Sequence, residues 1–262
     1  MTAIPSVQYA KNRDFTLAYQ VTGTGPKDLV YLLFETPNVV GNWFIPEHAR
    51  FMERLSSFSR LVITDRRGMG CSDRLPPGQS PTLEDLVDDL LVVMETAYAT
   101  PAIVLAGSET AFVTLLAAAT HPDRFGGLIL WGPSPSWRRS EELPWESSED
   151  QIEADLGVIR RVTSLRAWAE RWTREALPSW AEDPDAVSNA EALSALAGSA
   201  EAWYQDQRMF HSIDLRHLLP SIRTPTLVLA RPEAHAGLHI ESARLLADRM
   251  PNATLVELCG YT

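Results

Sequence analysis

The sequence predicts an α/β protein in which a mostly parallel sheet carries helices on both faces. Short continuous apolar runs, which suit strands buried on both faces, lie at residues 28–34, 60–64, 102–106, 126–132, 226–230 and 254–258. Segments with helical spacing of apolar residues alternate with them, at 47–58, after Thr82, after Ser108 and at 240–249. Strands that alternate with helices indicate parallel pairing with crossover helices.

Two parts of the chain depart from this alternation. Residues 8–21 include an alternating apolar and polar stretch, which predicts a half-buried strand in an opening hairpin. Residues 133–220 lack strand-like runs and predict helices at 149–163, 165–177, 185–197 and 199–217. We therefore expect a core formed by residues 1–132 and 221–262, with 133–220 inserted as a helical cap over the carboxyl ends of the strands, where open α/β sheets bind ligands.

The bulk properties limit the function classes. The chain of 262 residues has a net charge of −11 and a pI near 5.0, which argues against a nucleic-acid partner. No apolar run approaches the length of a membrane span, and the N-terminus has no apolar signal core. Cys71 and Cys259 are too few for a disulfide framework and indicate a reducing setting. We expect a cytoplasmic protein, a monomer or a homodimer, that acts on a small molecule without a membrane partner.

Ser108 stands where a buried strand turns into a helix. The run that ends at Gly107 is apolar, and Ala111 and Leu115 begin a helical pattern. This is the setting of a nucleophile elbow, and the main-chain N–H of Glu109 would face negative charge that develops there. The other interpretation is that Ser108 only caps the helix. The usual G-x-S-x-G frame is Ala106 to Thr110 here, and the β-branched Thr110 is expected to crowd the turn.

Three stretches carry a resemblance to a known family: AYQVTGTGPKDLVYL (18–32), FSRLVITDRRGMGCSDR (58–74) and LAGSETA (105–111). TPTLVLARPEA (224–234) adds weaker support. The chain resembles the α/β-hydrolase superfamily, closest to bacterial hydrolases of that fold that also occur joined to adenylate-cyclase or transcriptional-regulator domains. The DRRGMGCSD pattern has a structural role there: its glycines shape a turn, and Ser72 and Asp73 cap it.

The resemblance implies a set of catalytic roles. In this family a serine attacks a carbonyl, a histidine takes its proton, an acid orients the histidine and two main-chain N–H groups bind the oxyanion. Ser108 matches the nucleophile and Glu109 supplies one N–H. The second donor would be the amide of Phe34 or Glu35, although the glycine that relatives carry there is missing.

At the positions that the family uses for the acid and the histidine, this sequence does not carry those residues. The acid position falls on Ala234, which is flanked by Glu233 and His235. The histidine position falls at about residue 263. If the gene continues, we expect a histidine at or within two residues of that position. Glu233 could replace the acid and His235 the base, or both could be surface loop residues. His211 and His217 could face the pocket from the cap, but we expect them on a helix surface.

The aromatic residues of 133–220 predict the pocket. Trp137, Trp168, Trp172, Trp203 and Tyr204 are expected to line a mostly apolar cavity for a small or medium organic molecule, without a cofactor or metal. The favoured function is an enzyme that uses Ser108 on a largely apolar ester, lactone or related carbonyl compound. Without a base such an enzyme would be a poor general esterase. The alternatives are a non-hydrolytic lyase, cyclase or isomerase of small-molecule biosynthesis, and a non-enzymatic ligand sensor.

Overall fold

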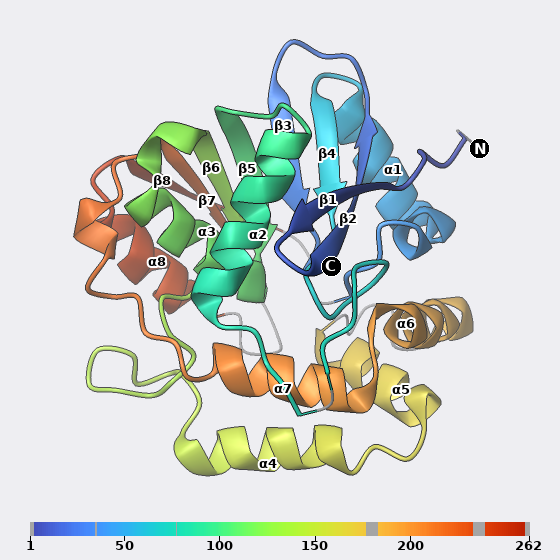
Figure 1. Cartoon of the computed structure of the whole chain (residues 1–262). Coiled ribbons are helices and arrows are strands. Elements are labelled where there is room, and N and C mark those ends of the chain that lie inside the picture. Colours follow the sequence, from blue (N-terminus) through green and yellow to red (C-terminus); the bar gives the residue numbers. More distant parts are fainter. Residues whose placement is uncertain (1–2, 35, 77, 177–182, 233–238, 260–262) are drawn as a thin grey trace.

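A single mixed sheet organises the molecule (Figure 1). The computed structural model describes residues 3–34, 36–76, 78–176, 183–232 and 239–259. Eight strands pair in the order β1-β2-β4-β3-β5-β6-β7-β8. Their bounds are β1 (Gln8–Asn12), β2 (Phe15–Thr22), β3 (Asp28–Leu32), β4 (Arg60–Thr64), β5 (Ala102–Gly107), β6 (Phe125–Trp131), β7 (Thr226–Ala230) and β8 (Ala253–Glu257). Strands β1 and β2 form the predicted antiparallel hairpin, β2 pairs antiparallel with β4, and the strands from β4 to β8 are parallel.

Helices cover both faces of the sheet, as the sequence predicts. They are α1 (Pro46–Ser56), α2 (Leu83–Thr96), α3 (Ser108–Thr120) and α8 (Ile240–Arg249). In β5, Val104 belongs to the large apolar cluster that packs under α2, α3 and α8. Its neighbour Leu105 belongs to the cluster on the opposite face, which includes Met52 of α1. Successive side chains of a strand point to opposite faces, so the continuous apolar run is explained by burial on both.

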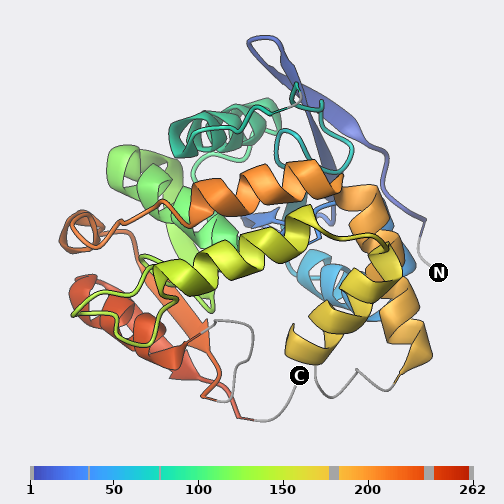
Figure 2. The same ribbon diagram turned by 90° about the horizontal axis from the view of Figure 1, so that it is seen from below.

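Among the described residues, four α-helices lie between β6 and β7: α4 (Glu149–Arg160), α5 (Leu165–Ala176), α6 (Pro184–Ala197) and α7 (Ala200–Phe210). We call them the inserted helices. They gather at one end of the sheet, beyond the tips of the central strands (Figures 1 and 2), where α4 packs with α7 and α5 with α6. No helix in the described ranges has the length and apolar character that crossing a membrane requires.

The prediction of a helix over 199–217 is wrong at its end. Helix α7 stops at Phe210, and the chain beyond it pairs with the segment that follows β6. The Leu215 N–H donates to the Pro135 carbonyl at 2.8 Å, and Asp214 forms an isolated bridge with Ser136. These tertiary hydrogen bonds replace the helical ones.

The DRRGMGCSD segment forms a loop tied to β2. The Ser72 hydroxyl accepts the Ala18 N–H at 2.9 Å, and the Asp73 carboxylate accepts the Thr16 N–H at 2.7 Å. Gly68 and Gly70 both have positive φ angles, of 82° and 56°. The expected structural role of this motif is therefore carried out by hydrogen bonds, which hold the loop against the sheet.

Gly70 allows a close approach that a side chain would prevent. A Cβ atom there would lie 2.2 Å from the Asp65 carboxylate, and φ lies in the left-handed region that favours glycine. We expect Gly70→Ala to lower the free energy of unfolding by about 1–3 kcal/mol, measured by urea denaturation. Gly78→Ala is the matched control, because Gly78 also has positive φ but open space around its Cβ position. Equal losses in the two variants would contradict the role of the Asp65 contact.

Candidate functional site

Ser108 sits on a strained turn at the tip of the central strand β5. It is the first residue of α3 and has a φ of 46°, which is uncommon for a residue other than glycine. The N-cap of α3 is Gly107, and no described residue forms a hydrogen bond with the Ser108 hydroxyl. The interpretation of Ser108 as a helix cap therefore does not hold. Strained backbone of this kind collects at functional sites, where the surrounding structure maintains it.

Thr110 stabilises this turn instead of crowding it. Its hydroxyl accepts the Gly107 N–H at 3.1 Å and donates to the Gly107 carbonyl at 2.9 Å. On the other side, the Phe34 ring lies so close that a Cβ at position 107 would come within 2.9 Å of it. Glycine is needed at 107 because of this ring, and the β-branched Thr110 is tolerated because its side chain turns back onto the strand end.

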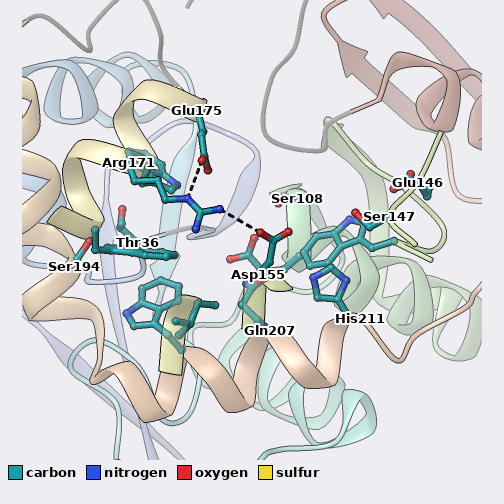
Figure 3. Close-up of a pocket in the computed structure, with 16 residues that line it drawn as sticks. Thr36, Ser108, Glu146, Ser147, Asp155, Arg171, Glu175, Ser194, Gln207 and His211 are labelled. Carbon is teal, nitrogen blue, oxygen red and sulfur yellow. Dashed lines mark hydrogen bonds and ion pairs between the residues drawn. The ribbon is translucent and has the colours of Figure 1, made fainter. Parts of the chain in front are cut away.

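Ser108 lines a cavity of about 280 Å³ under the inserted helices (Figure 3). The tryptophans that line it are Trp137, Trp168, Trp172 and Trp203. Tyr204 is not among its lining residues, because its ring packs under the Arg160 guanidinium at 4.5 Å. The cavity is mixed where the sequence predicts a mostly apolar one: besides Ser108, the tryptophans and Ile159, the lining includes Thr36, Glu109, Glu146, Ser147, Asp155, Arg171, Glu175, Ser194, Gln207 and His211. The inserted helices are amphipathic, and several of their polar residues face this cavity.

A charged group at the edge of the cavity joins α4 to α5. Arg171 donates to Glu175 at 2.7 Å and to Asp155 at 3.2 Å (Figure 3). Each of the three side chains keeps at least a third of its surface exposed. An exposed pair of this kind contributes little to stability. This pairing places two carboxylates and a guanidinium on the wall of the cavity.

His211 contributes an imidazole to the same cavity, contrary to the expected helix-surface position. Its ring packs edge-on against Trp137 with 5.2 Å between the ring centres, whereas His217 is exposed. Burial lowers the pKa of His211 to about 4. The imidazole is therefore neutral near pH 7, and burial makes it a weaker base than an exposed histidine.

The His211 pKa has a consequence for stability. Because the folded-state pKa lies below the usual value of 6.5, the unfolded chain binds more protons between pH 6.5 and about 4. The stability contributed by neutral His211 is present above pH 6.5 and is lost as the pH falls through this window. We expect His211→Gln to lose less stability than the wild type between pH 7 and 4.5, measured by thermal unfolding. A parallel loss in both proteins would contradict this assignment.

Glu146 is a second titratable group that sequence reasoning missed. It belongs to the loop after β6, is 2% exposed and lines the cavity. The Ser242 hydroxyl accepts the Trp145 N–H at 2.6 Å and donates to Glu146 at 2.5 Å. Burial raises the pKa of Glu146, although the hydrogen bonds from Ser242 and Ser134 oppose the shift. The loop thus presents a carboxyl group that takes up a proton more readily than an exposed glutamate.

The remaining predicted site residues fall into two groups. Glu35, Glu233 and His235 lie outside the described residues. Phe34 borders the elbow with its ring, and Glu109, next to the nucleophile position, is buried and paired with Arg66 at 2.8 Å. Across the described ranges there is no group of three or more His, Cys, Asp or Glu side chains that could hold a metal ion.

Comparison with known proteins identifies the fold family. Residues 40–260 match the family model described as the alpha/beta hydrolase fold. The human serine hydrolase BPHL is 25% identical over 265 residues, which cover 93% of this chain and 78% of that protein. The crystal structure of a bromoperoxidase from Bacillus anthracis superposes with a TM-score of 0.81 at 20% identity, covering 97% of this chain and 91% of that one. An enol-lactonase from Burkholderia xenovorans LB400 gives a TM-score of 0.78 at 21% identity over 96% and 91% of the two chains.

A serine at the strand-to-helix elbow of a mostly parallel sheet, beneath helices inserted between two strands, defines an enzyme of the hydrolase fold. The chain belongs to the alpha/beta hydrolase fold family.

Proposed function

We propose that this protein is a serine hydrolase that cleaves a small ester, lactone or related carbonyl compound with Ser108 as the nucleophile. The observation that carries the proposal is the Ser108 backbone, held at a φ of 46° with its residue on the wall of the cavity. The cavity of about 280 Å³ suits a small molecule. The names of the relatives, a serine hydrolase and an enol-lactonase, support the same reaction class.

The reaction has two steps. The Ser108 oxygen forms a bond to the carbonyl carbon, and the alcohol leaves with a proton; water then releases the acid and restores the serine. The main-chain N–H of Glu109, in the first turn of α3, is the proposed oxyanion donor. The second donor expected from the sequence is the amide of Phe34 or of Glu35, and Glu35 lies outside the described residues. His211 is the candidate proton acceptor among the described residues on the cavity, and His235 is the candidate in the 233–238 segment.

The substrate class follows from the mixed lining. The indoles of Trp137 and Trp203 provide apolar contact area, and Arg171, Asp155 and Gln207 provide polar contacts. We therefore propose an amphipathic substrate with at least one polar group away from the scissile bond, in place of the largely apolar one expected from the sequence.

The test uses p-nitrophenyl acetate and a panel of small lactones with the wild-type enzyme. Hydrolysis that follows saturation kinetics and is lost in a Ser108 variant supports the proposal. Hydrolysis that survives removal of the Ser108 hydroxyl contradicts it.

Non-hydrolytic chemistry is the second candidate. Glu146 with its raised pKa and the neutral His211 could move a proton on a substrate without a covalent serine intermediate. The two proposals differ in whether an oxygen atom from water enters the product. In H₂¹⁸O the hydrolase places ¹⁸O in the product acid, whereas a lyase or isomerase that only moves protons within its substrate incorporates none.

A further inference from the structure

Arg66 lies at the centre of a buried charge cluster behind the elbow. One terminal nitrogen donates to Glu109 of α3 at 2.8 Å, and the other donates to Asp206 of α7 at 3.0 Å. The three side chains are between 2% and 6% exposed. The guanidinium also lies over the Phe210 ring, 5.4 Å from its centre. The cluster thus joins three separate parts of the fold: the loop after β4, the helix that begins at Ser108, and an inserted helix.

Stability alone is a poor explanation for this cluster. Taking charges out of water costs several kcal/mol per ion, and buried ion pairs are often no more stabilising than apolar residues of the same volume. Here two carboxylates share one guanidinium. Burial and the nearby Glu109 charge raise the pKa of Asp206 to about 6, although Arg66 opposes the shift. In the described structure the Arg66 Nε also has no hydrogen-bond partner.

The cluster is instead suited to fixing geometry. A guanidinium is planar and presents its donors in a fixed fork, so the two carboxylates it binds hold defined positions relative to each other. Glu109 directly follows Ser108, and its main-chain N–H is the proposed oxyanion donor. The elbow is thereby held at two points: Thr110 binds the main chain of Gly107, and Arg66 binds the side chain of Glu109.

We propose that Arg66 is a positioning residue for the reaction at Ser108, and that it acts by holding Glu109 against α7. This inference rests on the proposed serine-hydrolase function. A small misplacement of an oxyanion donor costs much of the rate while substrate binding is little affected.

The experiment measures covalent labelling of Ser108 by a fluorophosphonate probe. In this reaction the Oγ–P bond forms, fluoride leaves and the serine proton is lost. Labelling at several probe concentrations separates the maximal rate from the probe concentration at half-maximal rate. We expect Arg66→Met to lower the maximal rate about 100-fold, with the half-saturating concentration within about threefold of wild type.

Arg67→Met is the matched control. Arg67 is the next residue along the chain, is 6% exposed and forms a similarly buried pair with Asp89 of α2 instead of with α3 or α7. We expect it to lower the melting temperature and to leave the labelling rate within about threefold of wild type. The inference is overturned if Arg66→Met and Arg67→Met label at the same rate.

A second pair of variants applies if Arg66→Met does not fold. Glu109→Met removes the carboxylate that Arg66 binds in α3 and keeps the Arg66–Asp206 pair, and we expect its maximal rate to fall about tenfold. Glu109→Gln keeps an acceptor for Arg66 and should recover most of that loss. A wild-type rate in Glu109→Met overturns the inference. Absence of Ser108 labelling in the wild-type protein would overturn the proposed function itself, which is a separate outcome.

Discussion

Replacing Ser108 by alanine is expected to lower the rate of ester or lactone hydrolysis by about 10³-fold or more, because removal of the nucleophile leaves only binding and oxyanion stabilisation. The substitution removes only the hydroxyl oxygen, which forms no hydrogen bond with the described residues, so the fold should be kept. Steady-state kinetics with p-nitrophenyl acetate gives the rate, and a thermal melt confirms that the variant is folded.

Ser212→Ala is the control for this measurement. Ser212 is exposed beyond the end of α7, and its hydroxyl donates only to the Met209 carbonyl among the described residues. Its kcat/KM should stay within about twofold of wild type, since surface substitutions have small effects. A Ser108→Ala enzyme that keeps more than a tenth of the wild-type rate would exclude Ser108 as the nucleophile.

Replacing Phe112 by alanine is expected to lower the free energy of unfolding by about 3–5 kcal/mol, the range for deleting a fully buried aromatic side chain. Phe112 has no exposed surface and lies one helical turn after Ser108. Its ring stacks on Phe210 of α7 with 6.0 Å between centres and meets Trp137 edge-on at 5.2 Å. The substitution therefore leaves a cavity between the elbow helix and the inserted helices.

Denaturant unfolding of Phe112→Ala beside Phe58→Ala measures this effect. Phe58 is 53% exposed, so its removal should cost less than about 1 kcal/mol. A loss of unfolding free energy below about 1 kcal/mol in Phe112→Ala would show that the contact of Phe112 with α7 does not stabilise the folded protein.

The strands and the elbow can be predicted from the sequence because their signals are local. The apolar run that ends at Gly107 suits a buried strand in length and composition, and the change to helical spacing after Ser108 marks the turn. The amphipathic spacing of 165–177 predicts α5 for the same reason. The end of the last inserted helix cannot be predicted in this way, because hydrogen bonds to residues 135 and 136, far away in the sequence, determine it.

The charged part of the site could not be predicted in this way. Glu109 in the first turn of a helix is ordinarily a solvated residue, and its partner Arg66 is 43 positions away. Glu146 lies in a loop that shows no periodicity, so nothing local indicates that it folds into the cavity. Side chains of this kind acquire their environment only from tertiary packing, which a single sequence does not display.

The measurement that tests the account most directly is mass spectrometry of the protein after reaction with a fluorophosphonate. The account predicts one adduct per chain, located on the peptide that contains Ser108 and absent when the probe is added to Ser108→Ala. An adduct on another residue, or an unmodified Ser108 in a protein that still hydrolyses esters, would contradict the claim that this hydroxyl is the nucleophile.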